Sequence, residues 1–391
     1  MAASFLGWTL DAFDFFAVVF LVQRLADHFV VSKGAIVWTI TATLAMRPLG
    51  AVLFGMLADR YGRRIPLMAN VIFFSVVELL CGFAPNYLSF LLLRILFGIG
   101  MGGEWGVGAS MAMEAAPPRW RGVLSGVLQS GYSMGYLLAA VAARFILPNF
   151  GVNGWRMMFW AGGAPALLAF YIRRHVPESA AWLQHRAQSL GEIWRAVGRF
   201  GRQFAGLVLL MTLMMCLSHG TQDLYPDFLK SVHHFSDSRV SYMAMFYNVG
   251  AILGAICFGH LSQRFGRRHS MLLALGVSLL VIPLWAFGSR LGVLVCGSFL
   301  MQVGVQGAWG IIPAHLNELA PDAVRGLLPG LAYQLGILFA APTNTVEYLL
   351  RDHIGYARAM AVFEICTILC AAVVIARGRE EHGKSFVGGG G

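Results

Sequence analysis

The chain is a succession of long apolar stretches separated by short polar breaks. A helix needs about 20 apolar residues to cross the hydrocarbon core of a bilayer, and these stretches are that long. They predict an all-α integral membrane protein with twelve transmembrane helices, at 5–23, 35–57, 66–84, 88–115, 123–147, 155–173, 205–226, 238–260, 270–288, 291–316, 327–349 and 357–376.

One ten-residue sequence occurs twice in the polar breaks. Residues 55–64 are GMLADRYGRR, and residues 259–268 are GHLSQRFGRR. Three further residues recur at the same offset, since Trp105, Glu114 and Arg121 are matched by Trp309, Glu318 and Arg325. The repeat predicts two pseudo-symmetric six-helix bundles, as found in transporters. The predicted parts are an N-terminal bundle (1–174), a linker (175–202), a C-terminal bundle (203–377) and a tail (378–391).

Composition and charge agree with a membrane location. Hydrophobic residues make up 58% of the chain and charged residues 12%. A net charge of +10 could indicate a nucleic-acid partner, but the basic residues follow the loops of one side instead: Arg60, Arg63, Arg64, Arg119, Arg121, Arg173, Arg174, Arg186, Arg195, Arg199, Arg202, Arg264, Arg267, Arg268, Arg325, Arg377, Arg379 and Lys384. The positive-inside rule predicts that this side is cytoplasmic. We therefore expect a multi-pass protein of the bacterial inner membrane with both termini in the cytoplasm.

The linker contains an amphipathic run with Trp182, Leu183, Leu190, Ile193 and Trp194. It is predicted to lie along the cytoplasmic membrane surface, and a disordered linker is the alternative. We expect bilayer lipid but no nucleic acid as a partner, and a monomer.

Several motifs that would indicate other functions are excluded by their context. All six cysteines fall within predicted spans, which argues against a disulfide framework or a cysteine metal site. Gly98, Gly100 and Gly103 spell G-x-G-x-x-G, but within an apolar helix rather than after a strand. Metalloprotease, serine-hydrolase and P-loop signatures are absent from the sequence. We therefore expect no enzyme activity and no cofactor.

The duplicated motif resembles the cytoplasmic loop signature of the major facilitator superfamily, which lies between helices 2 and 3 and again between helices 8 and 9. Arg94 with Gly98, Gly100 and Gly102 resembles that superfamily's fourth-helix motif. The resemblance implies a gate latch that holds the cytoplasmic helix ends together, formed by Gly55, Asp59, Arg60, Gly62, Arg63, Glu114, Arg121, Gly259, Arg264, Gly266, Arg267 and Glu318. Gln263 replaces the acid in the second copy, which predicts a weaker latch there.

A narrower resemblance lies on the seventh span. Residues 218–226, SHGTQDLYP, resemble the S-H-x-x-Q-D signature of lactate and pyruvate proton symporters of the fungal lactate-permease type, within the sialate:proton symporter group. Residues 7–16, GWTLDAFDFF, fit the same group. The chain departs from this signature at two positions. It has Met215 where the signature has Asn, and Asp227 where the signature has Thr. The resemblance implies uptake of a small organic acid with a proton.

Charged residues within spans are costly and indicate functional candidates. Asp11 and Asp14 share one face of the first helix, and Arg47 lies within the second. Pairing Arg47 with either aspartate would leave the other free to take a proton. A static ion pair that fixes the two helices is the alternative.

On the seventh span, His219, Gln222 and Asp223 share one face. His219 could both donate to a carboxylate and titrate near neutral pH, whereas Asp223 could instead cap the helix end. Arg94 could clamp a substrate carboxylate, with an interhelical brace as the alternative.

Other polar residues in the spans are weaker candidates. Glu104 is a second proton site or a tether. Further candidates are Gln129, Tyr132, Tyr136, Asn248, Gln302, Gln306, Tyr333, Gln334, Asn344 and Glu347, and Glu364 is expected at the periphery. The sequence thus predicts proton-coupled uptake of a short monocarboxylate, with sialate or a dicarboxylate as the alternative substrate.

Overall fold

The first five predicted spans are helices, and the sixth begins as one. The structure, a computed structural model, describes residues 1–163, 167, 171–172, 175–185 and 189–386. The first half contains α1 (Ala2–Phe29), α2 (Lys33–Tyr61), α3 (Arg64–Cys81), α4 (Tyr87–Ala115), α5 (Arg121–Asn149) and α6 (Gly154–Ala161). The sixth predicted span starts with α6, and its later part lies largely outside the described residues. Ser32 caps α2, and Asn86 forms a capping box at the start of α4, so the polar breaks fix where these helices begin.

The second half repeats this arrangement with two interruptions. Its helices are α10 (Gly201–Gln222), α11 (Tyr225–Ser231), α12 (Asp237–Phe265), α13 (Arg267–Phe287), α14 (Leu291–Leu319), α15 (Leu328–Ala340), α16 (Thr343–Ile354) and α17 (Tyr356–Arg377). The prediction of one continuous helix over 327–349 was wrong, because the chain breaks between α15 and α16 at Pro342. Proline lacks an amide hydrogen and clashes with the preceding turn. The span predicted at 205–226 is interrupted in the same way ahead of Pro226.

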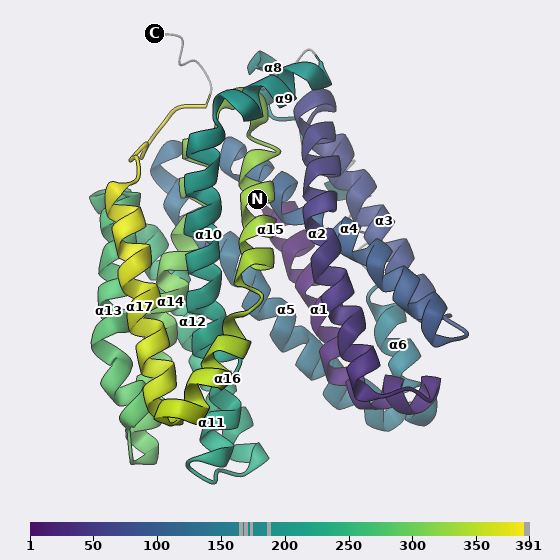
Figure 1. The fold of residues 1–391 in the computed structure, drawn as a ribbon. Coiled ribbons are helices and arrows are strands. Elements are labelled where there is room, and N and C mark those ends of the chain that lie inside the picture. Colours follow the sequence, from purple (N-terminus) through teal and green to yellow (C-terminus); the bar gives the residue numbers. More distant parts are fainter. Residues whose placement is uncertain (164–166, 168–170, 173–174, 186–188, 387–391) are drawn as a thin grey trace.

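The described helices confirm the all-α fold. Ten helical segments of the described residues are long and apolar enough to cross a membrane. Helices α1–α6 pack on one side of the molecule and α10–α17 on the other, and α8 (Ala180–His185) and α9 (Leu190–Arg199) cross one end between them (Figure 1). This end is called the linker end below.

The basic loops predicted to share one side meet at the linker end. Glu178 of the linker bonds the loop after α2, and Lys384 of the tail bonds Arg121 at the start of α5. Arg173, Arg174 and Arg186 lie outside the described residues. Ile193 of α9 is buried against Val324 and Leu327, whereas Trp194 is half exposed. One face of α9 therefore packs on protein, and Trp194, on an adjoining face, is available to a membrane surface.

Candidate functional site

The first copy of the repeated motif joins the two bundles at the linker end. Asp59, at the end of α2, accepts hydrogen bonds from the backbone amides of Gly326 (2.8 Å) and Leu327 (3.0 Å), just before α15 of the other bundle. Arg63 donates to Asp59 at 2.5 Å and to Glu114 at 3.0 Å. All three side chains are buried. A carboxylate at a helix N-terminus is favourable because the amides there have no partners within the helix.

The second copy makes the matching contacts in the opposite direction. Gln263 accepts from the amide of Gly122 at 3.2 Å and donates to the carbonyl of Pro118 at 2.6 Å. Arg267 pairs with Glu318 at 2.9 Å, and Arg121 reaches the same carboxylate across the bundles at 3.0 Å. The residue of the other bundle that corresponds to Arg121 is Arg325, whose guanidinium lies 3.5 Å from the Glu114 carboxylate of the first copy. The side-chain amide of Gln263 therefore replaces the missing acid as an acceptor, but it accepts from one backbone amide where Asp59 accepts from two.

Sequence reasoning missed two acids that complete this latch. Glu178 accepts from the backbone amide of Arg63 at 2.8 Å, at the start of α3, and Glu380 accepts from the amide of Arg268 at 2.8 Å, at the start of α13. Each follows the last helix of its bundle, and that pseudo-symmetric placement is the signal that could have found them. Among the remaining motif residues, Gly62 and Gly266 adopt the positive φ that the turns require, and Gly55 and Gly259 allow close contact with the other bundle. Arg60 lies over the ring of Tyr61, and Arg264 is exposed.

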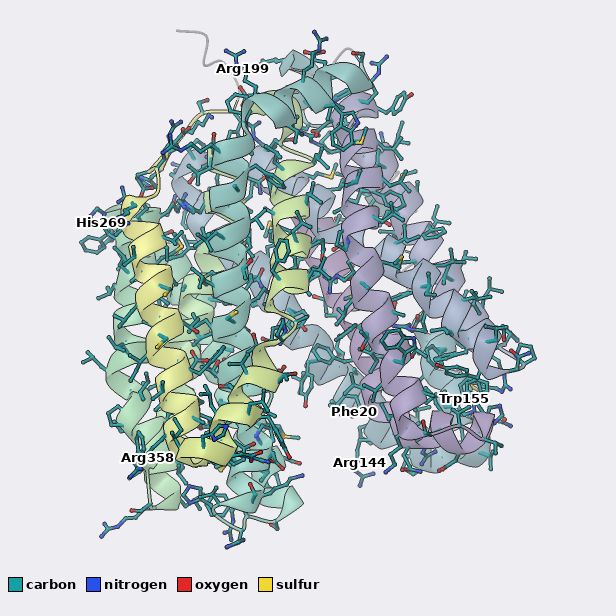
Figure 2. All side chains as sticks on the ribbon, viewed as in Figure 1. Phe20, Arg144, Trp155, Arg199, His269 and Arg358 are labelled. Carbon is teal, nitrogen blue, oxygen red and sulfur yellow. The ribbon has the colours of Figure 1, made fainter. Side chains whose placement is uncertain are left out.

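The two bundles separate at the end opposite the linker. Phe20 and Arg144 lie on one side of the separation and Arg358 on the other, while Arg199 lies at the linker end (Figure 2). The His219 and Asp223 side chains, at the end of α10, are 39% and 38% exposed, although both fall within the span predicted at 205–226. The structure is therefore closed at the linker end, and solvent reaches the inner residues from the other end.

Arg47 lies where the two bundles face each other between these ends. Its guanidinium carbon is 6.0 Å from the ring centre of Tyr333 on α15. Tyr333 stacks on Trp105 at 4.2 Å and meets Trp8 and Trp309 edge-on. Pseudo-symmetric tryptophans from α4 and α14 thus enclose a tyrosine beside a buried cation.

The predicted pairing of Arg47 with Asp11 or Asp14 is absent as a direct contact among the described residues. Nε and Nη2 of Arg47 have no hydrogen-bond partner there, and neither do the carboxylate oxygens of Asp11 and Asp14. Arg47 acts on Asp11 electrostatically only. Glycine sets this arrangement, because a side chain at Gly102 would collide with the backbone of Arg47, so α2 packs directly on α4.

Arg94 makes the interhelical contact that the sequence left as its alternative. Its guanidinium bonds Glu78 of α3 at 2.8 Å, lies 4.2 Å from the Phe97 ring centre, and is completely buried. Asp14 lies close to this pair, since a side chain at Gly162 would meet both Asp14 and Glu78. Glu78 is a buried acid within a predicted span that sequence reasoning missed.

Replacing Arg94 by glutamine should lower the thermal stability of the protein, because it leaves Glu78 as a buried charge without its partner. Breaking a buried pair costs about 3–5 kcal/mol, whereas removing both charges costs much less. The double variant Arg94→Gln/Glu78→Gln should therefore recover much of the loss in a melting experiment on detergent-solubilised protein. A substrate clamp predicts a different result: no recovery of transport, and little change in melting temperature for Arg94→Gln.

The helix 7 candidates form a polar group on α10. His219 and Asp223 are 3.0 Å apart, and Asp223 accepts from Asn344 of α16 at 2.8 Å. Gln222 instead donates to Gln302 of α14 at 2.8 Å.

The weaker polar candidates are held by local contacts. Gln306 donates to Ser218, Asn248 donates to the carbonyl of Ala244, and Gln334 donates to the carbonyl of Gly102. Tyr132 stacks on Trp8, Tyr136 packs on Phe16, and Gln129 is buried.

Glu364, which was expected at the periphery, lies in the contact between α17 and α10. Glu364 of α17 is completely buried, because Gly220 of α10 leaves room for its carboxylate. Glu347 of α16 is also buried, and none of the four carboxylate oxygens has a hydrogen-bond partner among the described residues. Glu104 is similarly buried without a partner in the described part of the chain, against Gly7 of α1.

Comparison with known proteins identifies the family. The sequence matches the Major Facilitator Superfamily over residues 4–341 and again over residues 208–389. The chain belongs to this superfamily, and it is a multi-pass membrane protein of a transporter family rather than an enzyme.

Three relatives have named substrates. The chain is 31% identical to a Saccharomyces cerevisiae protein named carboxylic acid transporter protein homolog, over 89% of the chain and 60% of that protein. It is 32% identical to a probable 4-methylmuconolactone transporter of Cupriavidus pinatubonensis, over 95% of the chain and 87% of that protein. It is 26% identical to the sialic acid transporter NanX of Escherichia coli, over 98% and 94%. The chain thus spans less than two thirds of the yeast protein's length.

A solved structure has the same fold. The proton:xylose symporter XylE, bound to 6-bromo-6-deoxy-D-glucose, superposes with a TM-score of 0.80 at 19% sequence identity, over 98% of this chain and 96% of that one.

Proposed function

We propose that this protein takes up a short monocarboxylate, such as lactate or pyruvate, together with protons, by alternating access between its two bundles. The observation that carries the proposal is Arg47, a buried guanidinium at the bundle interface whose Nε and Nη2 have no partner among the described residues. A guanidinium donates two parallel hydrogen bonds to one carboxylate. The substrate anion would supply the missing acceptors.

Proton coupling is supported by the charges buried in α1–α4. The described residues there include four buried carboxylates between the latch and the open end, on Asp11, Asp14, Glu78 and Glu104, against two buried guanidiniums, on Arg47 and Arg94. An ionised carboxylate without a partner is costly in an apolar interior. At least some of these acids would therefore hold protons in this state, and the sequence's proton candidates Asp11, Asp14 and Glu104 are among them.

The orientation of the protein follows from its basic loops. Since the linker end carries most of the loop arginines, the positive-inside rule puts it in the cytoplasm of a bacterial cell. The conformation described here would then be open to the outside and ready to receive an acid and protons. Inward release would require the latch residues to separate. We propose that the protein works as a monomer.

An inward pH gradient should drive accumulation of labelled lactate into proteoliposomes that contain the protein. A protonophore should abolish this accumulation, because the gradient would no longer supply free energy. At least one of Asp11→Asn, Asp14→Asn and His219→Gln should lose coupled uptake, whereas Asp27→Asn on the exposed part of α1 should behave as wild type. Unchanged accumulation in all three inner variants would contradict proton coupling by these residues.

A second substrate class is sialate or another organic acid such as a dicarboxylate. The named substrates of two relatives, sialic acid and methylmuconolactone, favour it. Competition against labelled lactate by pyruvate, sialate, muconate and succinate would separate the two. Stronger inhibition by sialate or muconate than by pyruvate would show that the larger acid, not a short monocarboxylate, is the preferred substrate.

A further inference from the structure

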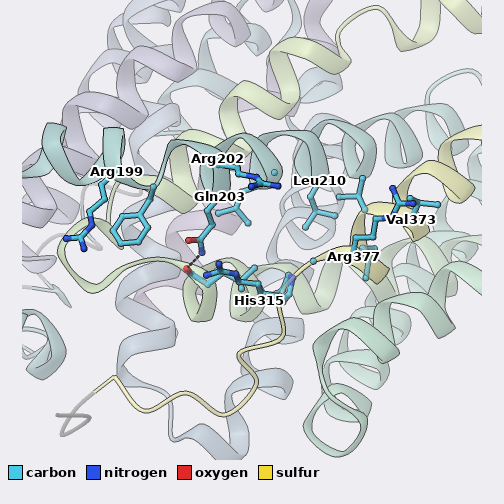
Figure 3. A pocket seen from close by; sticks show the side chains of 15 residues that line it. Arg199, Arg202, Gln203, Leu210, His315, Val373 and Arg377 are labelled. Atoms are coloured by element: carbon cyan, nitrogen blue, oxygen red, sulfur yellow. Dashed lines mark hydrogen bonds between the residues drawn. The ribbon is translucent and has the colours of Figure 1, made fainter. Parts of the chain in front are cut away.

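A cavity at the linker end of the C-terminal bundle lies beside the latch, and none of the candidate substrate or proton residues lines it. Its volume is about 710 Å³, within the range of ordinary ligand pockets. Its walls come from the end of α9, the first turns of α10, the last turn of α14 and the last turns of α17. Arg199 lies at one end of the cavity, Val373 and Arg377 lie at the other, and His315 of α14 faces the residues of α10 (Figure 3).

The cavity is strongly cationic. Four of its lining residues are arginines, Arg199, Arg202, Arg377 and Arg379, and none of the lining residues is acidic. Among the described residues, none of these arginines makes an ion pair or a hydrogen bond that would neutralise it. The nearby carboxylates of Glu318 and Glu380 are already occupied by Arg121, Arg267 and the amide of Arg268.

A buried polar atom in the cavity wall also has no partner. His315 is 3% exposed, and its Nδ1 has no hydrogen-bond partner in the described part of the chain. A buried polar group without a partner costs free energy, so its presence in a cavity wall points to a ligand that supplies the missing bond. An anionic oxygen would satisfy the imidazole and the arginines together.

The rest of the wall is apolar and continues toward the lipid-facing surface. Leu207 and Leu210 line the cavity from α10 and Val373 from α17. Val373 is about half exposed, as are Leu209 and Leu369 on the outer faces of the same two helices. A ligand here would have an anionic group at one end and hydrocarbon at the other.

We propose that this cavity binds an anionic phospholipid, with its phosphate held by Arg202, Arg377 and His315 and its acyl chains lying along α10 and α17. A free phosphate would use the same cationic groups but not the apolar wall, so the geometry favours the lipid. Basic pockets between transmembrane helices on the cytoplasmic side have the chemistry required for such headgroups. The site is independent of the transported substrate, so its test stands apart from that of the proposed function.

Native mass spectrometry of the full chain with phosphatidylglycerol tests the proposal. The double variant Arg202→Gln/Arg377→Gln should bind the lipid about 30-fold more weakly, because each basic residue removed weakens binding about fivefold. The matched control Arg144→Gln/Arg358→Gln removes the same charge at the opposite end and should bind as wild type. Both pairs are exposed, so folding should survive. Equal lipid binding by wild type and the cavity variant would overturn the proposal.

Two further arms separate the sources of the phosphate. Phosphatidylglycerol should raise the melting temperature of the wild type more than that of the cavity variant, because the lipid would join α10, α14 and α17. Zwitterionic phosphatidylcholine and inorganic phosphate should each do so much less. Stabilisation by inorganic phosphate equal to that by the lipid would instead assign the cavity to a soluble anion and overturn the lipid proposal.

Discussion

Replacing Arg47 by glutamine is expected to abolish binding and uptake of the substrate acid. Removing one partner of a buried, hydrogen-bonded charge pair costs about 2–5 kcal/mol, which corresponds to a loss of affinity of about 30-fold or more. The same guanidinium lies beside Tyr333 at the contact between the bundles, so its removal affects both binding and the closure around the substrate. Isothermal titration with detergent-solubilised protein measures the affinity directly.

Two controls make this result specific. Arg144→Gln removes an exposed arginine from α5 and should leave the affinity unchanged. Arg47→Lys keeps the charge but not the planar fork, and should fall between the wild type and Arg47→Gln. Full affinity in a folded Arg47→Gln protein would exclude Arg47 as the residue that binds the substrate carboxylate. His219 would then be the remaining candidate for that role.

Replacing Asp59 by asparagine is expected to open the linker end. The Asp59 carboxylate accepts two backbone amides of the other bundle and the Arg63 guanidinium, and an asparagine side chain has one acceptor oxygen for all three. Breaking a buried charge pair costs about 3–5 kcal/mol, enough to shift the balance between closed and open states about 100-fold. Spin labels at Tyr61→Cys and Phe265→Cys, in a background without native cysteines, would report a longer distance.

The second copy of the motif provides a matched comparison. Gln263→Ala removes two neutral hydrogen bonds, one from the amide of Gly122 and one to the carbonyl of Pro118, each worth about 1 kcal/mol, and should open the linker end less than Asp59→Asn does. This order follows from the charge of Asp59, because hydrogen bonds to a charged group are stronger than neutral ones. A larger opening in Gln263→Ala would reverse the predicted ranking of the two latches, and no opening in either variant would remove the latch role.

Much of the latch was predictable because its residues repeat in sequence. Asp59, Arg63 and Glu114 and their counterparts lie at corresponding positions of two copies, and a duplicated loop between equivalent helices must fold to equivalent places. The two capping acids, Glu178 and Glu380, were missed because they lie outside the repeated decapeptide. Their offset differs slightly from that of the motif, which hides the correspondence from a comparison at fixed spacing.

The inner charges were less predictable. The sequence placed Arg47, Arg94 and the aspartates of α1 on helices, but the partner of Arg94 is Glu78 on α3, and Arg47 faces Tyr333 rather than either aspartate. Helical periodicity assigns a residue to a face of its own helix and does not state which neighbour that face meets. The burial of Glu364 could not be predicted for the same reason, since it depends on Gly220 of another helix.

The sequence by itself determined the helical membrane-spanning class, the division into two related halves and the chemistry of the latch. These properties follow from the lengths of the apolar stretches and from repetition, which are local and additive along the chain. Only the tertiary structure decided which buried charges touch, where the eleventh span breaks and which end is closed. Those outcomes depend on the rotation and spacing of neighbouring helices, and small residues such as Gly102 and Gly220 set them by how closely they let backbones and side chains approach.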